Sequence, residues 1–510
     1  MTATLPSTLG AAAGPRPPQA RRLRRAVAAW LPSAVALTLG LLGLTSPSLW
    51  RDEAVSYTVA QESVGQIQQL TRTVDAVHEV YYLLVHLVFL VGTPSPGLLR
   101  APSVLAVAAT AWFVAATLRR LAGPRAGLLA GLSWACVPLV SRYAQEGRSY
   151  ALVSLAVAAA VYLLLRGVEA GEAGRRTAWW WSGYAVAVAV AGALNVMALL
   201  SLPAFAVTVA LWRPGWAAAL RWAAASVLGA LAVLPVALRS AGQTNAVDWL
   251  SAPTWRTPFA LAADFAGGRA ALPLVLVAVL LVALRRSPGG RSGGSPGRRR
   301  GPVALAVPLL LLPPGVLLLV SLQHSFYQPR YVLYALIGLS FLIGAGWDAA
   351  ARRLPVRPEP AAVAALAAVA ATAALGIPAQ LQLRQSDGHG SDARALAEAV
   401  AVRARPGDAV VFASLPARSI AFAYPRDFAG TADVALLSAF NPLKPDGLER
   451  PPAATAALLG RYARVWYVYS GHRNLRTGTR DQVLLQAVSG TRRLAGTWSA
   501  DGQSVQLFTR

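Results

Sequence analysis

The chain has 510 residues, of which 55% are hydrophobic and only 14% are charged, and its mean hydropathy is +0.47. Soluble domains carry about 25% charged residues, so the composition excludes a soluble globular enzyme, and the high hydrophobicity excludes a disordered chain. The 47 Lys and Arg exceed the 22 Asp and Glu by 25. In a soluble protein this excess would suggest nucleic acid, but here the arginines lie between apolar segments, so we predict a polytopic membrane protein with no nucleic-acid partner.

The composition of the N-terminal region changes from polar to apolar at residue 26. Residues 1–25 are rich in small residues and Pro, end in a cluster of arginines, and are predicted to form a disordered cytoplasmic tail. The apolar run from Ala26 to Thr45 is longer than the core of a signal peptide. It is therefore predicted to be a retained first membrane-spanning helix.

Further apolar segments follow along the chain, several of them shorter than the ~20 residues that cross a bilayer comfortably. We predict about 11–13 transmembrane helices in a module that extends over residues 26–378. The segments lie at 77–92, 98–118, 126–142, 147–166, 178–194, 196–212, 217–238, 271–284, 303–322, 331–349 and 361–378.

The distribution of arginine between these segments predicts their orientation. The 285–302 loop contains six arginines and no acid, and cytoplasmic loops are enriched in Lys and Arg. With this loop inside, the outer face receives the 47–78 loop, the 141–148 turn, the 239–270 loop, the 323–330 turn and the C-terminal region. Alternation then requires that 77–92 does not complete a crossing, or that the count is wrong by one helix. Other arginines that flank the predicted spans on the inner face are Arg119, Arg120, Arg125, Arg175, Arg176, Arg213, Arg221, Arg352 and Arg353.

Residues 379–510 are predicted to form a small extracytoplasmic α/β domain. An Ala-rich helical segment at 391–405 precedes strand candidates at 409–413, 465–469 and 504–508, which are bounded by Gly, Pro and Asp. The domain contains no Gly-rich phosphate loop, so no nucleotide is implied. The single cysteine, Cys136, excludes an internal disulfide, and no Cys/His spacing typical of a metal site occurs, so we predict no metal and no cofactor.

Carboxylates in the first outer loop are the leading candidates for chemistry, because membrane-spanning helices exclude unpaired charge. Asp52 and Glu53 follow the first span directly, next to Trp50, which is suited to the membrane interface. They are predicted to hold carboxylate groups at the boundary between water and lipid. The alternative is that they are acids of the first turn of a surface helix, where they stabilise its dipole.

Three more polar clusters lie on the predicted outer face. An Arg on this face requires an anionic partner, which could be a carboxylate or a phosphate bound through its planar fork of donors. The alternatives are an interfacial aromatic belt for the first cluster and a buried ion pair between Glu146 and an Arg for the second. The clusters contain Asp75, His78, Glu79, Tyr81 and Tyr82; then Gln145, Glu146 and Arg148; and finally Tyr327, Arg330 and Tyr331.

The order of these motifs resembles a known family. The motifs are Trp50-x-Asp52-Glu53-Ala54, Asp75-x-x-His78-x-x-Tyr81-Tyr82, Arg100-x-Pro102-Ser103, Gln145-Glu146-x-Arg148-x-Tyr150 and Arg330-Tyr331. Together they resemble the GT-C membrane glycosyltransferases that use polyprenyl-phosphate sugars. Within that fold they are most similar to the superfamily of protein O-mannosyltransferases and aminoarabinose transferases in its actinobacterial form. The resemblance covers residues 20–350.

The resemblance implies an inverting glycosyltransferase in the plasma membrane. It would transfer a sugar, mannose or a related hexose, from a polyprenyl-phosphate donor to a hydroxyl of a glycan, lipid or protein acceptor at the outer face. Asp52 would act as the general base, with Glu53 beside it. The resemblance further implies donor or phosphate binding by His78, Arg100, Arg148, Tyr327, Arg330 and Tyr331, and substrate binding by Asp75, Tyr81, Tyr82, Gln145 and Glu146.

Two other functional classes compete with this interpretation. A polytopic transporter or lipid flippase is consistent with a dozen spans, although the two related halves typical of transporters are not apparent in the sequence. A membrane-anchored binding protein would use the C-terminal domain for recognition. Transfer of a labelled sugar by the purified protein distinguishes these alternatives.

Overall fold

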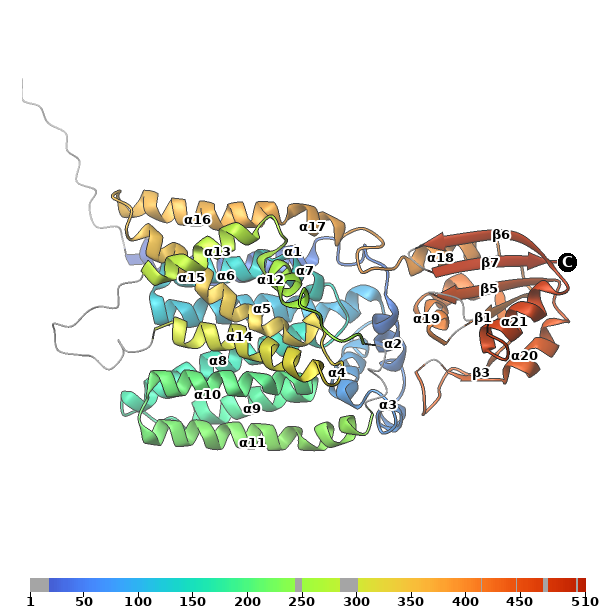
Figure 1. The fold of residues 1–510 in the computed structure, drawn as a ribbon, viewed down its shortest axis with the longest axis horizontal. Helices are drawn as coiled ribbons and strands as arrows, with labels where there is room; N and C mark the ends of the chain where they lie inside the picture. Colours follow the sequence, from blue (N-terminus) through green and yellow to red (C-terminus); the bar gives the residue numbers. More distant parts are fainter. Residues whose placement is uncertain are drawn as a thin grey trace, which may run out of the picture.

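The computed structural model describes residues 18–243, 250–284, 301–413, 415–445, 447–470, 476–500 and 503–510. These residues form a long helical bundle followed by a small α/β domain that lies beyond one end of the bundle (Figure 1). The predicted arginine loop at 285–302 and the first 17 residues of the predicted tail lie outside the described residues, apart from residues 301 and 302.

The helical bundle consists of long apolar helices whose length matches a bilayer. Within the described residues, six helical segments are long and apolar enough to cross a membrane, and five shorter apolar helices accompany them. The main helices of the bundle, including two short ones that are not in that count (α6 and α7), are α1 Pro18–Leu41, α5 Pro96–Ala122, α6 Pro124–Cys136, α7 Pro138–Ala144, α8 Tyr150–Glu172, α9 Ala178–Leu194, α10 Ser201–Trp212, α11 Trp216–Ala241, α13 Leu272–Leu281, α14 Val303–Ser321, α15 Leu336–Ala351 and α16 Pro358–Leu375.

Two helices form the centre of the bundle. Helix α5 packs against α1, α6 and α8, while α15 packs against α6, α13 and α14. Close approach depends on glycine at these crossings: a Cβ atom on Gly344 would lie 2.6 Å from the carbonyl oxygen of Ala126. This separation is far below a van der Waals contact, so α15 and α6 approach backbone to backbone.

Short helices cover the end of the bundle that faces the α/β domain (Figure 1). They are α2 Arg51–Val59, α3 Val64–Thr71, η1 Ala76–His78, α4 Glu79–Phe89, η2 Val196–Leu200, α12 Thr257–Ala266, η6 Pro329–Ala335 and α17 Ile377–Gln382, and a further short helix, η4 Val282–Leu284, follows α13. Helix α4 has 11 residues and is therefore ~16 Å long, about half the thickness of the hydrocarbon core. It is too short to cross a bilayer.

The bundle begins earlier than the sequence predicts. Helix α1 starts at Pro18, whereas we expected a disordered tail up to residue 25. The arginines of residues 21–25 therefore belong to the first turns of α1. Residues 20–26 consist of Ala, Arg and Leu, which all have a high helix propensity. The arginines are therefore compatible with a helix that begins before the apolar run.

The C-terminal domain is a five-stranded sheet with helices on both faces. Its strand order is β2-β1-β5-β7-β6, with β1 parallel to β2 and β5, and β7 antiparallel to β5 and β6. Alternate residues of β1 point to opposite faces: Val410 packs in the core with α18 and α19, and Val411 packs in the core with α20 and α21. The elements are α18 Ala393–Ala401, β1 Asp408–Phe412, α19 Leu415–Ala423, η7 Pro425–Phe428, β2 Thr431–Asp433, β3 Leu436–Ser438, β4 Leu448–Glu449, α20 Pro452–Leu459, β5 Arg464–Ser470, α21 Arg480–Ser489, β6 Arg493–Ala500 and β7 Gln503–Thr509.

Hydrogen bonds join this domain to the segment between α1 and α2, at the start of the loop that we predict to be the first outer one. The Leu49 amide donates to the Tyr424 hydroxyl (2.9 Å), and the Ser48 hydroxyl donates to the Asp392 carboxylate (2.8 Å). Asp392 also caps α18 by accepting from the amide of Ala395. These contacts fix the C-terminal domain against the end of the bundle that carries the predicted site residues.

Candidate functional site

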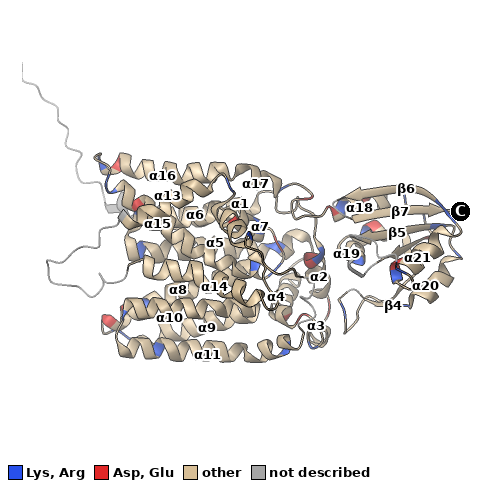
Figure 2. Cartoon of the chain, in the orientation of Figure 1, with Lys and Arg blue, Asp and Glu red and all other residues tan. Residues whose placement is uncertain are grey.

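The predicted site residues gather at the end of the bundle below the C-terminal domain. They come from α2, η1, the start of α5, the turn between α7 and α8, and η6. Arg100 lies in the first turns of α5, whereas Arg119 and Arg120 occupy its last turn. Figure 2 shows further Lys and Arg positions, coloured blue, at the opposite end of the bundle. The two ends of the same helix therefore serve different environments.

Glu53 and Arg100 form a completely buried ion pair at the base of this site. Arg100 Nε and Nη2 donate to the two carboxylate oxygens of Glu53 at 2.8 and 2.7 Å. Its other N–H groups donate to the carbonyl oxygens of Leu44, Pro47 and Ser48. All five donors of the guanidinium are thus occupied within the chain. Arg100 does not fit the predicted role of a phosphate ligand.

Glu53 connects four segments of the chain. Besides Arg100, it accepts a hydrogen bond from the Gly147 amide at 2.7 Å, and the ring Nδ1 of His389 lies 3.5 Å away. Burial alone would raise the pKa of this carboxyl, but the Arg100 charge and these hydrogen bonds hold the pKa at about 2. Glu53 is therefore a buried ionised anchor, and it is not exposed to an acceptor as a catalytic group would be.

Asp52 has the opposite environment. Its side chain is 26% exposed, and its carboxylate lies 3.7 Å from Nη2 of Arg330. Successive side chains of an α-helix point ~100° apart, so Glu53 enters the bundle while Asp52 faces the rim. Of the two predicted catalytic carboxylates, Asp52 alone combines accessibility with a cationic neighbour.

Arg330 is surrounded by aromatic rings. Its guanidinium carbon lies 5.5 Å from the ring centre of Trp50, 5.7 Å from that of Tyr150 and 5.8 Å from that of Tyr331. These distances lie within the range of cation–π attraction. Its buried Nε has no hydrogen-bond partner among the described residues. Tyr331 flanks Arg330 as predicted, whereas no ring contact links Tyr327 to it in the described part of the chain, and the buried Tyr327 hydroxyl lacks a partner there.

Arg148 organises the region between α2 and η1. It donates to the Ser56 hydroxyl (3.2 Å) and to the carbonyl oxygen of Asp52 (3.3 Å), and its Nη2 lies 2.5 Å from Nε2 of His78. Because a guanidinium can only donate, Nε2 of His78 is the acceptor and carries no proton. Burial and the charges of Arg148 and Arg330 lower the pKa of His78 well below its usual range. His78 is therefore neutral.

Three of the remaining members of the 75–82 cluster, Asp75, Glu79 and Tyr82, have polar partners within the chain. Asp75, in the left-handed backbone region (φ 58°), accepts a hydrogen bond from the Tyr82 hydroxyl at 3.1 Å. Glu79 forms a 2.7 Å ion pair with Arg239 of α11. The Tyr81 hydroxyl is buried without a partner among the described residues. The cluster thus holds η1 and α4 in place beside Arg148.

The turn between α7 and α8 contains the other two predicted substrate ligands. The Gln145 amide donates to the carbonyl oxygens of Gly40 and Leu42, and so satisfies the C-terminal end of α1. Glu146 is buried, and neither of its oxygens has a hydrogen-bond partner within the described ranges. Its nearest cation is Arg142, at 3.7 Å. Burial raises the pKa of Glu146 to about 7.

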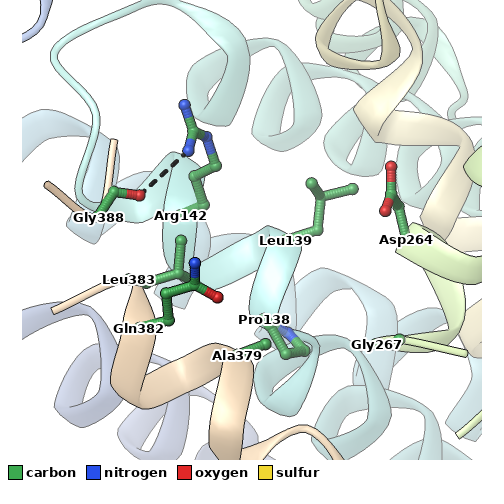
Figure 3. A pocket seen from close by; sticks show the side chains of 10 residues that line it. Pro138, Leu139, Arg142, Asp264, Gly267, Ala379, Gln382, Leu383 and Gly388 are labelled. Atoms are coloured by element: carbon green, nitrogen blue, oxygen red, sulfur yellow. Dashed lines mark hydrogen bonds between the residues drawn. The ribbon is translucent and has the colours of Figure 1, made fainter. Parts of the chain in front are cut away.

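A cavity of about 290 Å³ has Arg142 among its lining residues. Figure 3 shows Arg142 and Gly388 on one side of it and Asp264 on the other. Arg142 donates to the Gly388 carbonyl oxygen at 3.4 Å, and its Nε lies 3.7 Å from the Glu146 carboxylate.

Some residues of the site were not predicted from the sequence. Ser56 and Gly147 act through a hydroxyl and a backbone amide, which leave no distinctive pattern. His389 contacts Glu53 across 336 positions of the chain, and it lies between the predicted domain boundary at 379 and the predicted helix at 391–405, in a segment to which we assigned no role. No group of three or more His, Cys, Asp or Glu residues that could hold a metal ion occurs among the residues described.

Comparisons with known proteins show a partial family match and a likeness of fold. Residues 80–238 match the family described as dolichyl-phosphate-mannose-protein mannosyltransferase. The structure resembles ArnT from Cupriavidus metallidurans in the apo state, with a TM-score of 0.62 and 13% identity over 94% of this chain and 97% of that one. ArnT from the same organism bound to undecaprenyl phosphate gives a TM-score of 0.60 and 14% identity with the same coverage. No curated protein sequence matches the chain.

The likeness to ArnT extends over nearly the whole of both chains. It confirms the predicted fold class, a polytopic helical GT-C protein with a small C-terminal α/β region, and with it the resemblance that the sequence motifs indicated. The chain is therefore a membrane-embedded protein of the GT-C fold.

Proposed function

We propose that this chain, a membrane protein of the GT-C glycosyltransferase class, transfers a sugar from a polyprenyl-phosphate donor to an acceptor hydroxyl. The reaction takes place at the membrane face that carries the C-terminal domain, which we take to be the outer face. The observation that carries the proposal is the pair formed by Asp52 and Arg330, a partly exposed carboxylate 3.7 Å from an arginine in an aromatic cage.

Asp52 is suited to act as the general base. In the proposed reaction it accepts the proton of the acceptor hydroxyl while the hydroxyl oxygen forms a bond to the anomeric carbon of the donor. The bond between that carbon and the phosphate oxygen breaks, and the electron pair leaves with the polyprenyl phosphate. Attack from the face opposite to the leaving group inverts the anomeric centre.

Arg330 is suited to stabilise the departing phosphate. Its side chain is 13% exposed, its Nε is free of partners among the described residues, and a guanidinium matches two phosphate oxygens at once. A phosphate bound to Arg330 competes with Asp52 for the same cation. Binding of the donor would therefore weaken the ion pair and free the carboxylate to act as a base.

Support for the class of donor comes from the comparisons. The matching family is described by its use of dolichyl-phosphate-mannose, and one of the similar ArnT structures contains undecaprenyl phosphate. We therefore propose a polyprenyl-phosphate sugar, with mannose as the first sugar to test. The acceptor remains open between a protein hydroxyl, a lipoglycan and a cell-wall polysaccharide. The GT-C fold does not favour the alternative of a transporter or lipid flippase.

Transfer of radiolabelled mannose from polyprenyl-phosphate mannose by the purified protein in liposomes tests the proposal. Asp52→Asn should reduce transfer by at least ~10²-fold, because it removes the general base, while leaving the protein folded and inserted. A matched control is Glu169→Gln. Glu169 is also 26% exposed and pairs with an arginine, Arg120, but lies at the end of α8. Normal turnover by the Asp52 variant would overturn the assignment.

A further inference from the structure

A groove, the second hollow described in this structure, lies between α9 and α11 at the end of the bundle away from the candidate site. It has a volume of about 600 Å³, within the range of roughly 300–1,000 Å³ that is typical of ligand pockets. Helix α8 starts at the candidate site and has 23 residues, so its far end lies ~34 Å away. The groove therefore lies too far from the candidate site to take part in the proposed transfer reaction.

The charged end of this groove contains three arginines and no acid. Arg175 and Arg176 precede α9, and Arg221 lies in the second turn of α11. Several other arginines of this region have carboxylate partners: Arg120 and Arg166 pair with Glu169, and Arg125 and Arg352 pair with Asp348. The three groove arginines form no hydrogen bond or ion pair through their side chains with any described part of the chain.

The lining becomes apolar along the helices. Both α9 and α11 begin at this end of the bundle and run toward the candidate site (Figure 1). From the arginines the groove continues past Ser182 to Ala185, Ala225 and Leu228, which lie ~10 Å further along the helix axes. The same wall therefore changes from cationic to hydrocarbon in one direction, which matches a molecule with an anionic head and an apolar tail.

Exposed tryptophans place the groove at a membrane interface. Trp179 at the start of α9 is 81% exposed, and Trp216 at the start of α11 is 80% exposed. Tryptophan concentrates at the level of lipid headgroups. On α11, Val227, Leu228 and Leu231 are also exposed, as is expected of a helix surface in contact with lipid. The arginines thus lie at headgroup depth and the apolar wall lies at acyl-chain depth.

We infer that this groove binds an anionic phospholipid of the leaflet opposite to the candidate site. The headgroup phosphate would pair with Arg175, Arg176 and Arg221, and an acyl chain would lie along Ala185, Ala225 and Leu228. Basic pockets between membrane helices bind anionic headgroups because several cations can share one phosphate. Phosphatidylcholine, which has no net charge, should bind much more weakly.

Native mass spectrometry of the full-length protein titrated with phosphatidylglycerol or phosphatidylcholine tests this inference. We expect one saturable phosphatidylglycerol site. Replacement of all three arginines by Gln should weaken binding by at least ~10-fold. The matched control is Arg119→Gln, because Arg119 is exposed, lies at the same end of the bundle and does not line the groove. Equal loss in the control, or no loss in the triple variant, would overturn the site.

Two further binding experiments distinguish a site for a phospholipid from a site for a small anion. Glycerol phosphate and inorganic phosphate have the charge but no acyl chain, so they should bind more weakly than the lipid; equal affinity would overturn the lipid assignment. Ala224→Leu narrows the groove at an exposed position and leaves the arginines in place. It should weaken binding of the lipid and leave binding of phosphate unchanged. Circular dichroism confirms that each variant is folded.

Discussion

Asp52 and Glu53 show how neighbouring residues of the same type acquire different tasks. Both are acids of the first turn of α2, so the alternative interpretation, acids that stabilise a helix dipole, also describes their position. What separates them is the direction of each side chain. Glu53 is buried against Arg100, and Asp52 faces Arg330 at the rim. Their roles follow from contacts with residues 47 and 278 positions away, which no local pattern contains.

Replacing Glu53 should lower the thermal stability of the protein more than it lowers the rate of sugar transfer. Glu53→Gln removes the negative charge from a buried pair and places an amide N–H against the donors of Arg100. Breaking a buried pair typically costs ~3–5 kcal/mol, so we expect a clear loss of thermal stability. Thermal unfolding in detergent measures it. Glu169→Gln breaks a partly exposed pair, which is worth only ~0–1 kcal/mol. If the two variants lose the same stability, Glu53 is not the anchor.

Arg330→Lys separates a phosphate ligand from a structural ion pair. Lysine retains the charge and the attraction of the aromatic rings but has no planar fork of donors. We expect transfer to fall by ~10-fold or more, together with weaker binding of polyprenyl phosphate. Arg239→Lys, which keeps an ion pair with Glu79, should have little effect. Full activity and unchanged affinity of the Arg330 variant would exclude the phosphate role at this position.

The turn between α7 and α8 is the element that joins most parts of the site. Gln145 holds α1, Gly147 holds Glu53, and Arg148 holds His78 and α2. The sequence pointed to Gln145 and Arg148, but not to Gly147, because they stand out as charged or polar side chains in a short run between apolar segments. Gln145 was predicted to bind substrate and Arg148 to bind the donor phosphate, whereas in the structure both side chains hold other elements in position. A motif identifies which residues matter, but only their contacts show what they bind.

Glu146 should make the stability of this turn depend on pH. Its pKa is raised to about 7 in the folded protein, so the folded state favours the protonated acid. This contribution to stability is fully present below the pKa of the unfolded chain, near 4.5, and is lost as the pH rises through about 7. Unfolding temperatures at pH 5 and pH 8 should differ more for the wild type than for Glu146→Gln. The same difference in both proteins would contradict this assignment.

The C-terminal domain shows which elements a sequence reveals. The strands β1, β5 and β7 were predicted because each is a short apolar run between turn residues, and each is central in the sheet. Strand β6, Arg493–Ala500, was missed because it lies at the edge, its side chains are mostly exposed and its sequence contains no continuous apolar run. The contact of His389 with Glu53 was equally invisible, because it depends on how the domain folds back onto the bundle.

At the scale of the whole molecule, the two ends of the bundle have distinct chemistry. One end holds a buried polar site beneath the α/β domain, and the other holds arginines at helix ends, some paired with acids and others in the lipid groove (Figure 2). This asymmetry agrees with the tendency of positive charge to remain in the cytoplasm. We therefore retain the predicted topology, with the arginine loop inside and the C-terminal domain outside.

Labelling of single cysteines in intact cells tests this topology. The wild-type chain has one cysteine, Cys136, so a variant without it provides a clean background. A cysteine at position 295 should react with a membrane-impermeant maleimide only after the cells are opened, because its loop contains six arginines and should remain inside. A cysteine at exposed position 437 of the C-terminal domain should react in intact cells. The reverse pattern would place both the proposed transfer site and the C-terminal domain on the cytoplasmic side. A cytoplasmic site would need a donor on the inner leaflet, so the same experiment also decides where the sugar donor must be supplied.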